Sequence, residues 1–349
     1  MVGGAPQPVT GPEVWNGSEL SRSGGWWTEL GSSQVEELKR ATASSSGANG
    51  DAPPFSITRE DFPLPVTAEV QHEVRSGRSM RLLRGLPVAD LDAAGAARML
   101  WGIGSHIGAA EAQDASGSLL HEVRDTGRDL DEGNVRYYQT NRAIGFHNDG
   151  ADAFMLLCIN PAAAGGESRV VSATAVFNEL LRRAPDAAAL LQQPFYFDLR
   201  GQHADGATPY QTAPIFTLYA GRMHALYKRG YIDSGQRLAG VPPLTPEQVA
   251  ALDLLDELCD ELALDFALKR GDLLVGNNYL VLHDRRAFPD GHGGTHSDAT
   301  SPLRSRLMLR LWLSIPGGHG VPPALADTRE FRHSHARHLQ WGAGEAAGS

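Results

Sequence analysis

Cysteine, long apolar runs and clusters of basic residues are scarce in this sequence, and each absence excludes a class of protein. The two cysteines, Cys158 and Cys259, cannot build a disulfide scaffold or a four-cysteine zinc site, so both are interpreted as small buried hydrophobic residues. No apolar run approaches the roughly 20 residues that span a bilayer. Residues 1–15 lack the basic and apolar regions of a secretory signal. We therefore expect a cytoplasmic protein with no membrane partner.

Positive charge is also in deficit. Lys and Arg number 31 against 41 Asp and Glu, which gives a formal net charge of −10, and no basic stripe is visible. A nucleic-acid partner is therefore not expected. The hydrophobic fraction of 42% and the charged fraction of 21% are typical of a globular chain. The 39 Gly and 21 Pro predict many turns, as in a β-rich fold.

Composition divides the chain into three parts. Residues 41–54 are small and polar, and we interpret them as a flexible loop within an N-terminal extension over residues 1–60. Residues 61–320 are globular in composition, and residues 321–349 form a C-terminal tail. Short predicted strands dominate the globular part, and no βαβ alternation is present. The predicted fold class is therefore mainly β with flanking helices (α+β), as an antiparallel barrel or sandwich.

Local signals predict individual elements within this fold. Residues 245–248 (TPEQ) form a capping box, and helical apolar spacing follows to Leu264. Residues 153–160 (AFMLLCIN) are a continuous apolar run that predicts a buried strand. Residues 135–139 (VRYYQ) predict a further strand, and residues 220–222 (AGR) predict the turn of a β-hairpin.

The first residues with clear chemistry belong to His-x-Asp motifs. The sequence contains three of them, His147/Asp149, His203/Asp205 and His296/Asp298. The last two lie in small polar stretches and are interpreted as solvated loop residues. His147 and Asp149 instead lie between two predicted strands, and residues two apart on an extended chain point to the same face. This pair is therefore the best candidate for two metal ligands.

A third ligand could come from His283, which ends the predicted strand YLVLH. Two histidines and one carboxylate form the facial triad, which leaves three coordination positions open and suits non-haem Fe(II). From spacing alone, a hydrogen-bonded and half-buried histidine without a metal is the simpler interpretation of His283.

Two arginines interrupt the apolar strand predicted near the C-terminal end of the globular part (LRSRLMLRLWLS). Arg306 and Arg310 share one face of this strand with Trp312, which we interpret as a core residue. Buried guanidinium groups need anionic partners, and a dicarboxylate cosubstrate would supply one. A solvent-facing side of the strand, or an internal salt bridge, explains the pattern equally well.

Four segments follow one another in a recognisable order. They are GFHND around His147, GGES at residues 165–168, GDLLVGNNYLVLHDRRAF at residues 271–288 and RLMLRLWL at residues 306–313. Together they resemble the TauD/TfdA family of Fe(II)- and 2-oxoglutarate-dependent dioxygenases, over about residues 60 to 316. The resemblance implies a single jelly-roll domain over residues 61–320, with helical insertions. This is the double-stranded β-helix barrel of the clavaminate synthase-like type.

The resemblance also implies roles for individual residues. His147, Asp149 and His283 match the ligands of Fe(II). Arg306 matches the arginine that forms a salt bridge with the C5 carboxylate of 2-oxoglutarate, and Ser168 matches a hydroxyl residue that hydrogen-bonds the same carboxylate.

Further matches concern the surroundings of the site. Arg310 matches an arginine that contacts an anionic group of the substrate in some family members. Asn277 and Asn278 match a pair that either supports the iron and cosubstrate pocket or simply packs. The family often has glycine where this chain has Asp284, and the glycine-rich segment at residues 289–302 is a candidate lid.

The function implied by the resemblance is that of a dioxygenase that uses Fe(II), 2-oxoglutarate and O2 and releases succinate and CO2. It would oxidise, and most simply hydroxylate, an unactivated C–H bond of a small molecule, for which Arg310 favours an anionic group. Retention of Asp149 favours hydroxylation over halogenation. The alternative is a metal-binding, cupin-like β barrel with a binding or sensing role and no oxygenase activity. Formation of a homo-oligomer is left open.

Overall fold

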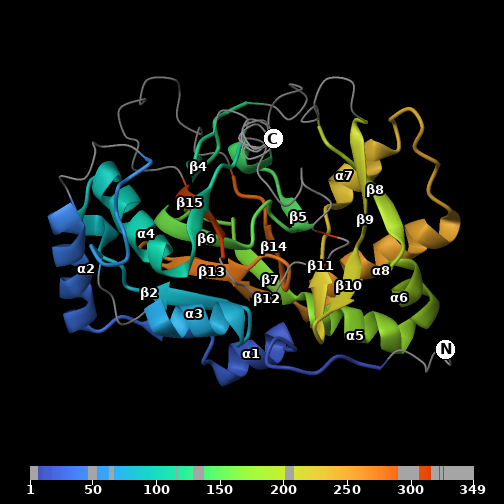
Figure 1. Ribbon diagram of the computed structural model, residues 1–349, viewed down its shortest axis with the longest axis horizontal. Coiled ribbons are helices and arrows are strands. Elements are labelled where there is room, and N and C mark those ends of the chain that lie inside the picture. Colours follow the sequence, from blue (N-terminus) through green and yellow to red (C-terminus); the bar gives the residue numbers. More distant parts are fainter. Residues whose placement is uncertain are drawn as a thin grey trace, which may run out of the picture.

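The computed structural model describes residues 7–45, 53–62, 67–114, 117–128, 137–200, 208–289, 306–315, 322 and 325 (Figure 1). The helices are α1 (Gly17–Ser23), α2 (Ser32–Ser44), α3 (Thr67–Arg75), η2 (Val88–Asp90), α4 (Ala93–Ile107), η3 (Tyr137–Gln139), α5 (Ala173–Arg183), α6 (Pro185–Leu190), α7 (Arg229–Gly235) and α8 (Pro246–Leu262), where η marks a 3-10 helix. The strands are β1 (Trp27–Glu29), β2 (Met80–Arg84), β3 (Ala109–Glu111), β4 (Leu120–Val123), β5 (Ile144–His147), β6 (Ala153–Asn160), β7 (Ser168–Ser172), β8 (Pro194–Asp198), β9 (Tyr210–Pro214), β10 (Phe216–Tyr219), β11 (Arg222–Ala225), β12 (Leu264–Phe266), β13 (Leu273–Asn277), β14 (Val281–Arg285) and β15 (Leu307–Ser314).

Two sheets form the centre of the molecule. The larger has the order β1-β2-β13-β6-β15-β3, with β4 also paired to β15, and the smaller has the order β12-β7-β14-β5. Apolar side chains from both sheets meet in one cluster, for example Phe154 and Trp312 from the larger sheet with Val170 and Val281 from the smaller. This packing of two sheets around one core fits the predicted double-stranded β-helix. Within the described residues, no hydrogen-bonded ladder joins the two sheets into a closed barrel.

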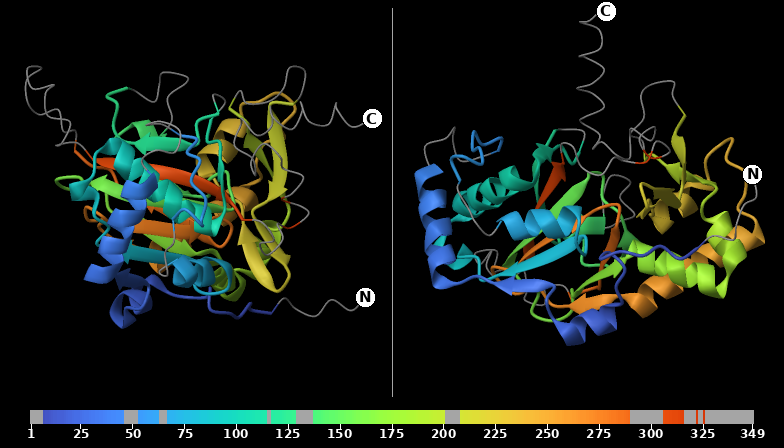
Figure 2. Two further views of the ribbon diagram at one scale, coloured as in Figure 1. Left: turned by 60° about the vertical axis from the view of Figure 1, so that its left-hand side comes forward. Right: turned by 60° about the horizontal axis from the view of Figure 1, so that its bottom comes forward.

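Helices cover the outer faces of the two sheets (Figures 1 and 2). Helix α4 packs on the larger sheet through residues such as Leu100 and Ile103, and Asp92 caps its first turn by accepting a hydrogen bond from the Gly95 backbone. Helices α5, α6 and α8 pack on the smaller sheet and on strands β8 to β11. The predicted class, mainly β with flanking helices, is confirmed, and no described helix has the length and hydropathy needed to span a bilayer.

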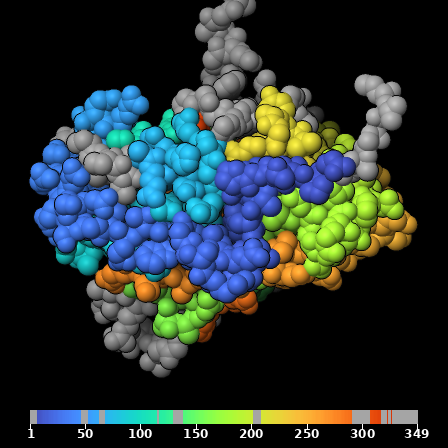
Figure 3. All heavy atoms as spheres, turned by 90° about the horizontal axis from the view of Figure 1, so that it is seen from below, coloured from blue at the N-terminus to red at the C-terminus, as the bar shows by residue number. Residues whose placement is uncertain are grey.

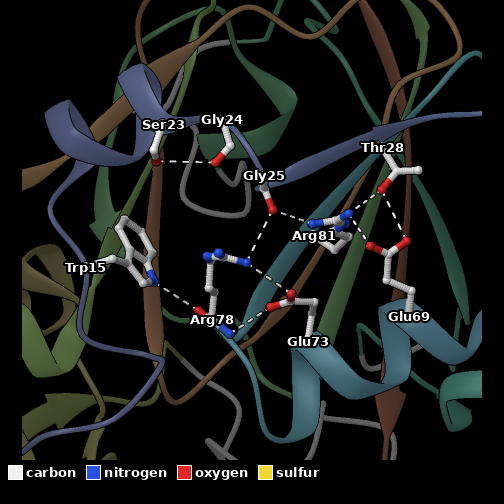
Figure 4. Close-up of polar contacts among 9 residues, drawn as sticks. All are labelled: Trp15, Ser23, Gly24, Gly25, Thr28, Glu69, Glu73, Arg78 and Arg81. Atoms are coloured by element: carbon white, nitrogen blue, oxygen red, sulfur yellow. Dashed lines mark hydrogen bonds and ion pairs between the residues drawn. The ribbon is translucent and has the colours of Figure 1, made fainter.

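The described part of the predicted N-terminal extension packs on this core. Trp15 and Trp26 belong to the cluster between the sheets, and β1 pairs in parallel with β2. Figure 4 shows the polar contacts that fix this segment: the Trp15 indole donates to the Arg78 carbonyl at 2.9 Å, and Arg81 pairs with Glu69. In Figure 3 the dark blue atoms of this segment spread across the face seen from below.

The predicted elements hold where local signals dominate. Helix α8 begins at the predicted capping box, in which Thr245 and Gln248 bond reciprocally, and β6 covers residues 153–160 as expected. Strands β10 and β11 form the predicted hairpin.

Two predictions of local structure are wrong. The described end of the segment at residues 135–139 is the 3-10 helix η3 and not a strand. The Tyr138 ring packs against Arg310 and His121, and this packing favours the helical turn over strand pairing. Helix α2 continues through Ser44 into the stretch predicted as a loop at residues 41–54, and hydroxyls near its end donate to its own carbonyls. Residues 46–52 of that stretch lie outside the described part.

Candidate metal centre

Three of the predicted ligands converge at one end of the smaller sheet. His147 on β5 lies directly opposite His283 on β14, and their ring centroids are 4.3 Å apart. Asp149 follows β5, with Oδ1 3.8 Å from His147 Nε2 and Oδ2 3.6 Å from His283 Nε2. One ligand atom from each residue lies within 4.8 Å of the others, and no other His, Cys, Asp or Glu residues in the described part form such a group of three. The structure therefore brings the predicted triad together.

The electrostatic surroundings keep His147 and Asp149 in the protonation states that bind a divalent cation. Burial, followed by the neighbouring His283, lowers the pKa of His147 to about 3, so this imidazole is neutral at pH 7. Burial alone would raise the pKa of Asp149, but Arg310 and the two imidazoles hold it well below its usual range. His147 Nδ1 donates to the Gly145 carbonyl at 2.9 Å, which leaves Nε2 for a metal.

The donor set itself fits iron. Two imidazole nitrogens and one carboxylate, with an open side, are the facial triad of non-haem Fe(II) sites, whereas thiolate-rich sites select zinc or iron–sulfur clusters. Both cysteines are buried and do not belong to this donor set. Cys158 Sγ contacts the Leu268 carbonyl, and Cys259 lies in the apolar cluster on which α8 packs.

A buried network holds the Asp149 carboxylate. Arg310 Nη1 lies 3.3 Å from Asp149 Oδ1, and the Trp312 indole donates to Oδ2 at 2.9 Å. Gln113 accepts from Arg310 Nε at 2.7 Å, and the guanidinium lies between the rings of Tyr138 and Trp312. Trp312 is thus a core residue that also contacts an iron ligand, a role the sequence interpretation missed. The signal for it was its shared strand face with Arg310.

The two asparagines ahead of β14 have different roles. Asn278 is buried, and its side chain accepts from the Asp149 backbone N–H at 2.7 Å and donates to the Asp149 carbonyl at 2.6 Å. Asn277 instead donates to the Val74 carbonyl and accepts from the Tyr279 N–H. The described contacts therefore bring Asn278 to the triad and do not bring Asn277 there.

The residues predicted to hold the distal carboxylate of 2-oxoglutarate lie further along the same core. Arg306 is buried, and burial lowers its pKa to about 10, so the guanidinium stays charged at pH 7. Its Nε and Nη1 have no hydrogen-bond acceptor among the described residues. Ser168 is buried at the start of β7. A buried guanidinium with unused donors is what a carboxylate ligand would complete, so these residues fit 2-oxoglutarate.

The Gly165-Gly166 turn allows Arg306 to approach. Gly166 has a φ of +67°, which favours glycine, and a Cβ added there would lie 3.3 Å from Arg306 Cδ. A larger residue at this position would strain the turn and press on the arginine.

A cavity of about 560 Å³ lies beside the triad, a size suited to a small molecule. Its lining includes His147, Asp149 and Arg310, together with Arg200, Lys228 and Tyr231, and does not include Arg306 or Ser168. The other two His-x-Asp motifs, and all of the candidate lid at residues 289–302 except residue 289, lie outside the described residues.

Comparison with known proteins gives the family. The family described as "Taurine catabolism dioxygenase TauD, TfdA family" matches residues 38–312. FR-33289 synthase of Streptomyces rubellomurinus is 29% identical over 337 residues, which cover 94% of this chain and 97% of the relative. Uridine-5'-phosphate dioxygenase of a Streptomyces species is 28% identical over 185 residues, which cover 50% of this chain and 62% of the relative.

Solved structures show the same fold. Asparagine oxygenase in complex with Fe(II), 2S,3S-3-hydroxyasparagine and succinate is similar with a TM-score of 0.61 and 16% identity, covering 82% of this chain and 93% of its own. The non-haem iron oxygenase OrfP in complex with Fe and alpha-ketoglutaric acid is similar with a TM-score of 0.60 and 13% identity, covering 89% and 98%.

The predicted family, jelly-roll fold class and enzyme class are confirmed by these matches, as are the cofactors Fe(II) and 2-oxoglutarate. The triad geometry and the match over most of the chain lead to one conclusion: this chain belongs to the TauD/TfdA family and is a non-haem Fe(II)- and 2-oxoglutarate-dependent dioxygenase.

Proposed function

We propose that this dioxygenase hydroxylates an unactivated C–H bond of a small anionic molecule bound in the cavity beside His147, Asp149 and His283. The observation that carries the proposal is the position of the triad: His147 and Asp149 both line the cavity, so a molecule within it lies next to the metal position. The intact carboxylate of Asp149 supports hydroxylation, since all three protein ligands are kept.

The proposal assigns the residues separate roles at the metal and at the cosubstrate. His147, Asp149 and His283 hold the metal, while Arg306 and Ser168 bind the distal carboxylate of 2-oxoglutarate. Bound Fe(II) and 2-oxoglutarate supply the oxidising chemistry, with O2 consumed and succinate and CO2 released. The chain's own contribution is to bind and orient the substrate and the cosubstrate and to exclude water.

Asp149 needs support because a tilted carboxylate would change the open face of the metal. Arg310 and Trp312 each bond one of its oxygens, and Asn278 fixes its backbone. Such contacts to a metal ligand set its orientation and its basicity.

Five basic and five acidic residues line the cavity, and the proposal of an anionic substrate rests on two of the basic ones, Lys228 and Arg200. The Lys228 ammonium and the Arg200 guanidinium lie over the Tyr231 ring at 4.9 and 5.9 Å, and Lys228 forms a backbone bridge with His147. Arg310 also lines the cavity, where its Nε and Nη1 bond Gln113 and Asp149, so its predicted contact with an anionic group of the substrate would use Nη2. One relative is named for uridine 5'-phosphate, a substrate with such a group. Action on a small molecule in the cytoplasm, without nucleic-acid or membrane partners, completes the proposal.

Succinate release tests the proposed function. Protein reconstituted with Fe(II) under anaerobic conditions would be mixed with 2-oxoglutarate, O2 and a panel of small anionic molecules, each paired with a neutral amide or ester. We expect succinate and a hydroxylated product from an anionic member and not from its neutral partner.

His147→Ala should abolish both products, because it removes a metal ligand. His203→Ala is the matched control, since it removes the histidine of another His-x-Asp motif, and it should leave turnover unchanged. Equal turnover in His147→Ala and wild type would contradict the proposed site.

A further inference from the structure

A second buried guanidinium lies close to Arg306. Arg285 is buried at the end of β14, two residues after His283, so both side chains point to the inner face of the smaller sheet. Its register partner on β7 is Ser168, which places these two residues side by side on that face. Arg285 therefore lies beside a residue already assigned to the cosubstrate.

Both guanidinium groups have unused donors. Nε and Nη1 of Arg285, and the same two atoms of Arg306, have no acceptor in the described part of the chain. Arg285 Nη2 donates to the carbonyls of Thr140 (2.8 Å) and Arg142, which holds the group in place. Four donor nitrogens in one buried region are thus left for a ligand, whereas nearly all buried polar groups in folded proteins have partners.

The two groups lie against the same aromatic ring. The guanidinium carbons of Arg285 and Arg306 lie over the same ring, that of Phe288, at 4.9 and 5.6 Å from its centroid. Guanidinium groups stay protonated at pH 7, so both groups are cationic. Two like charges out of water repel each other strongly, and an anion between them would offset that repulsion.

The chemistry and the spacing define the anion. A carboxylate has two oxygens with about four lone-pair directions and accepts charge-assisted bonds from guanidinium forks. Two residues along a strand span about 6.7 Å, so Arg285 lies about that far along β14 from the iron ligand His283. A 2-oxo acid bound to the metal through its 2-oxo end would extend its distal carboxylate toward these two guanidinium groups.

We propose that Arg285 joins Arg306 as a second guanidinium on the C5 carboxylate of 2-oxoglutarate, and that it makes the site selective for 2-oxo diacids over 2-oxo monoacids. The proposal rests on the proposed function, because it assigns a further residue to the same cosubstrate. Arg285 would bind the carboxylate directly, while Ser168 supports it from the adjacent strand.

Binding measured without turnover tests the assignment. Anaerobic Fe(II)-loaded protein would be titrated calorimetrically with 2-oxoglutarate and with 2-oxobutyrate, which lacks the distal carboxylate. Arg285→Met should weaken 2-oxoglutarate binding about 30-fold or more, while 2-oxobutyrate binding stays within about twofold of wild type. Arg285→Lys keeps the charge without the planar fork and should give an intermediate loss for 2-oxoglutarate alone.

The adjacent arginine supplies the control. Arg286 is exposed and paired with Asp265, so Arg286→Met should change neither affinity. Unchanged 2-oxoglutarate affinity in Arg285→Met would overturn the assignment. An equal loss for both acids would overturn it as well, because it would mean a structural role. If Arg285→Met does not fold, the lysine variant decides by the same criterion.

The two proposals fail in different ways. A wild-type protein that discriminates between the two acids through Arg285, yet hydroxylates no anionic molecule, would leave this assignment standing and remove the proposed substrate class.

Discussion

Arg306 directly precedes β15 and Arg310 lies within it, four residues later. The two guanidinium groups are both buried, but they differ in how many of their donors have partners. Arg310 is bonded to Asp149 and Gln113 and is flanked by two aromatic rings. Arg306 is equally buried, but two of its donors have no described acceptor. The same residue type on one strand face therefore serves two purposes.

The difference distinguishes residues whose hydrogen bonds are complete before a ligand binds from residues that need a ligand to complete them. The network around Asp149 is satisfied within the protein, so the metal ligand is held in place before any metal arrives. The unused donors of Arg306 and Arg285 have no described acceptor, and under our proposal the cosubstrate is their partner. A buried charge left without its partner is costly, so each region predicts its own response to mutation.

Loss of a metal ligand should have the largest effect on catalysis. Asp149→Ala removes the carboxylate of the triad, and loss of a mere supporting contact already lowers metal affinity about 10- to 100-fold. We expect iron affinity to fall by more than that, and succinate release to fall to the level of metal-depleted protein. Iron content after anaerobic reconstitution and succinate formation check this. Stoichiometric iron in the variant would argue against the triad.

Removal of Arg310 should strongly destabilise the metal-free protein. Arg310→Met leaves the ionised Asp149 buried without its partner, and breaking a buried pair in this way costs about 3–5 kcal/mol. The free energy of unfolding in denaturant would be compared with that of Arg182→Met, which breaks an exposed pair with Glu179. The exposed variant should lose far less, because solvent screens that pair. Similar losses in both variants would show that the Asp149 network contributes little.

Asn278 and Asn277 offer a matched pair of variants. Asn278→Ala removes both bonds to the Asp149 backbone and should lower iron affinity about 10- to 100-fold. Asn277→Ala removes contacts that lie away from the triad and should leave iron affinity unchanged. Competitive iron titration against a chelator measures both. A larger loss in Asn277→Ala would reverse the assignment.

The smallest effect is expected from Trp312→Phe. This change keeps an aromatic ring against Arg310 and removes only the indole bond to Asp149 Oδ2. Loss of one contact to a metal ligand lowers metal affinity about 10- to 100-fold, and because the bonds from Arg310 and Asn278 remain, a loss near the lower end, about tenfold, is expected. The same chelator competition measures it, and an unchanged affinity would mean that Arg310 alone orients the carboxylate.

Elements fixed by their own residues were predictable from the sequence. The capping box sets the start of α8, and the apolar run at residues 153–160 is β6. The segment Tyr137–Gln139 was not predictable, because its strand-forming composition is overridden by the packing of Tyr138 on Arg310 and His121. Those partners are distant in sequence and invisible to local periodicity.

The site divides in the same way. Motif order predicted the triad, which the structure brings together, and it predicted the cosubstrate roles of Arg306 and Ser168. Gln113 was missed, since it meets Arg310 across 197 positions of sequence. Arg285 lies in the motif at residues 271–288, but its proposed role follows only from its register with Ser168 and its contact with the Phe288 ring.

Thermal melting of Arg306→Met, with and without 2-oxoglutarate, tests the central contrast most directly. Anaerobic Fe(II)-loaded wild type should melt at a higher temperature with 2-oxoglutarate present, since a ligand at 100 times its Kd stabilises by about 2.7 kcal/mol. Arg306→Met should melt at or above the wild-type temperature without ligand, because it removes a buried charge that has no partner, and should show no shift with ligand. A variant that melts well below wild type without ligand, and still shifts fully with 2-oxoglutarate, would contradict the account.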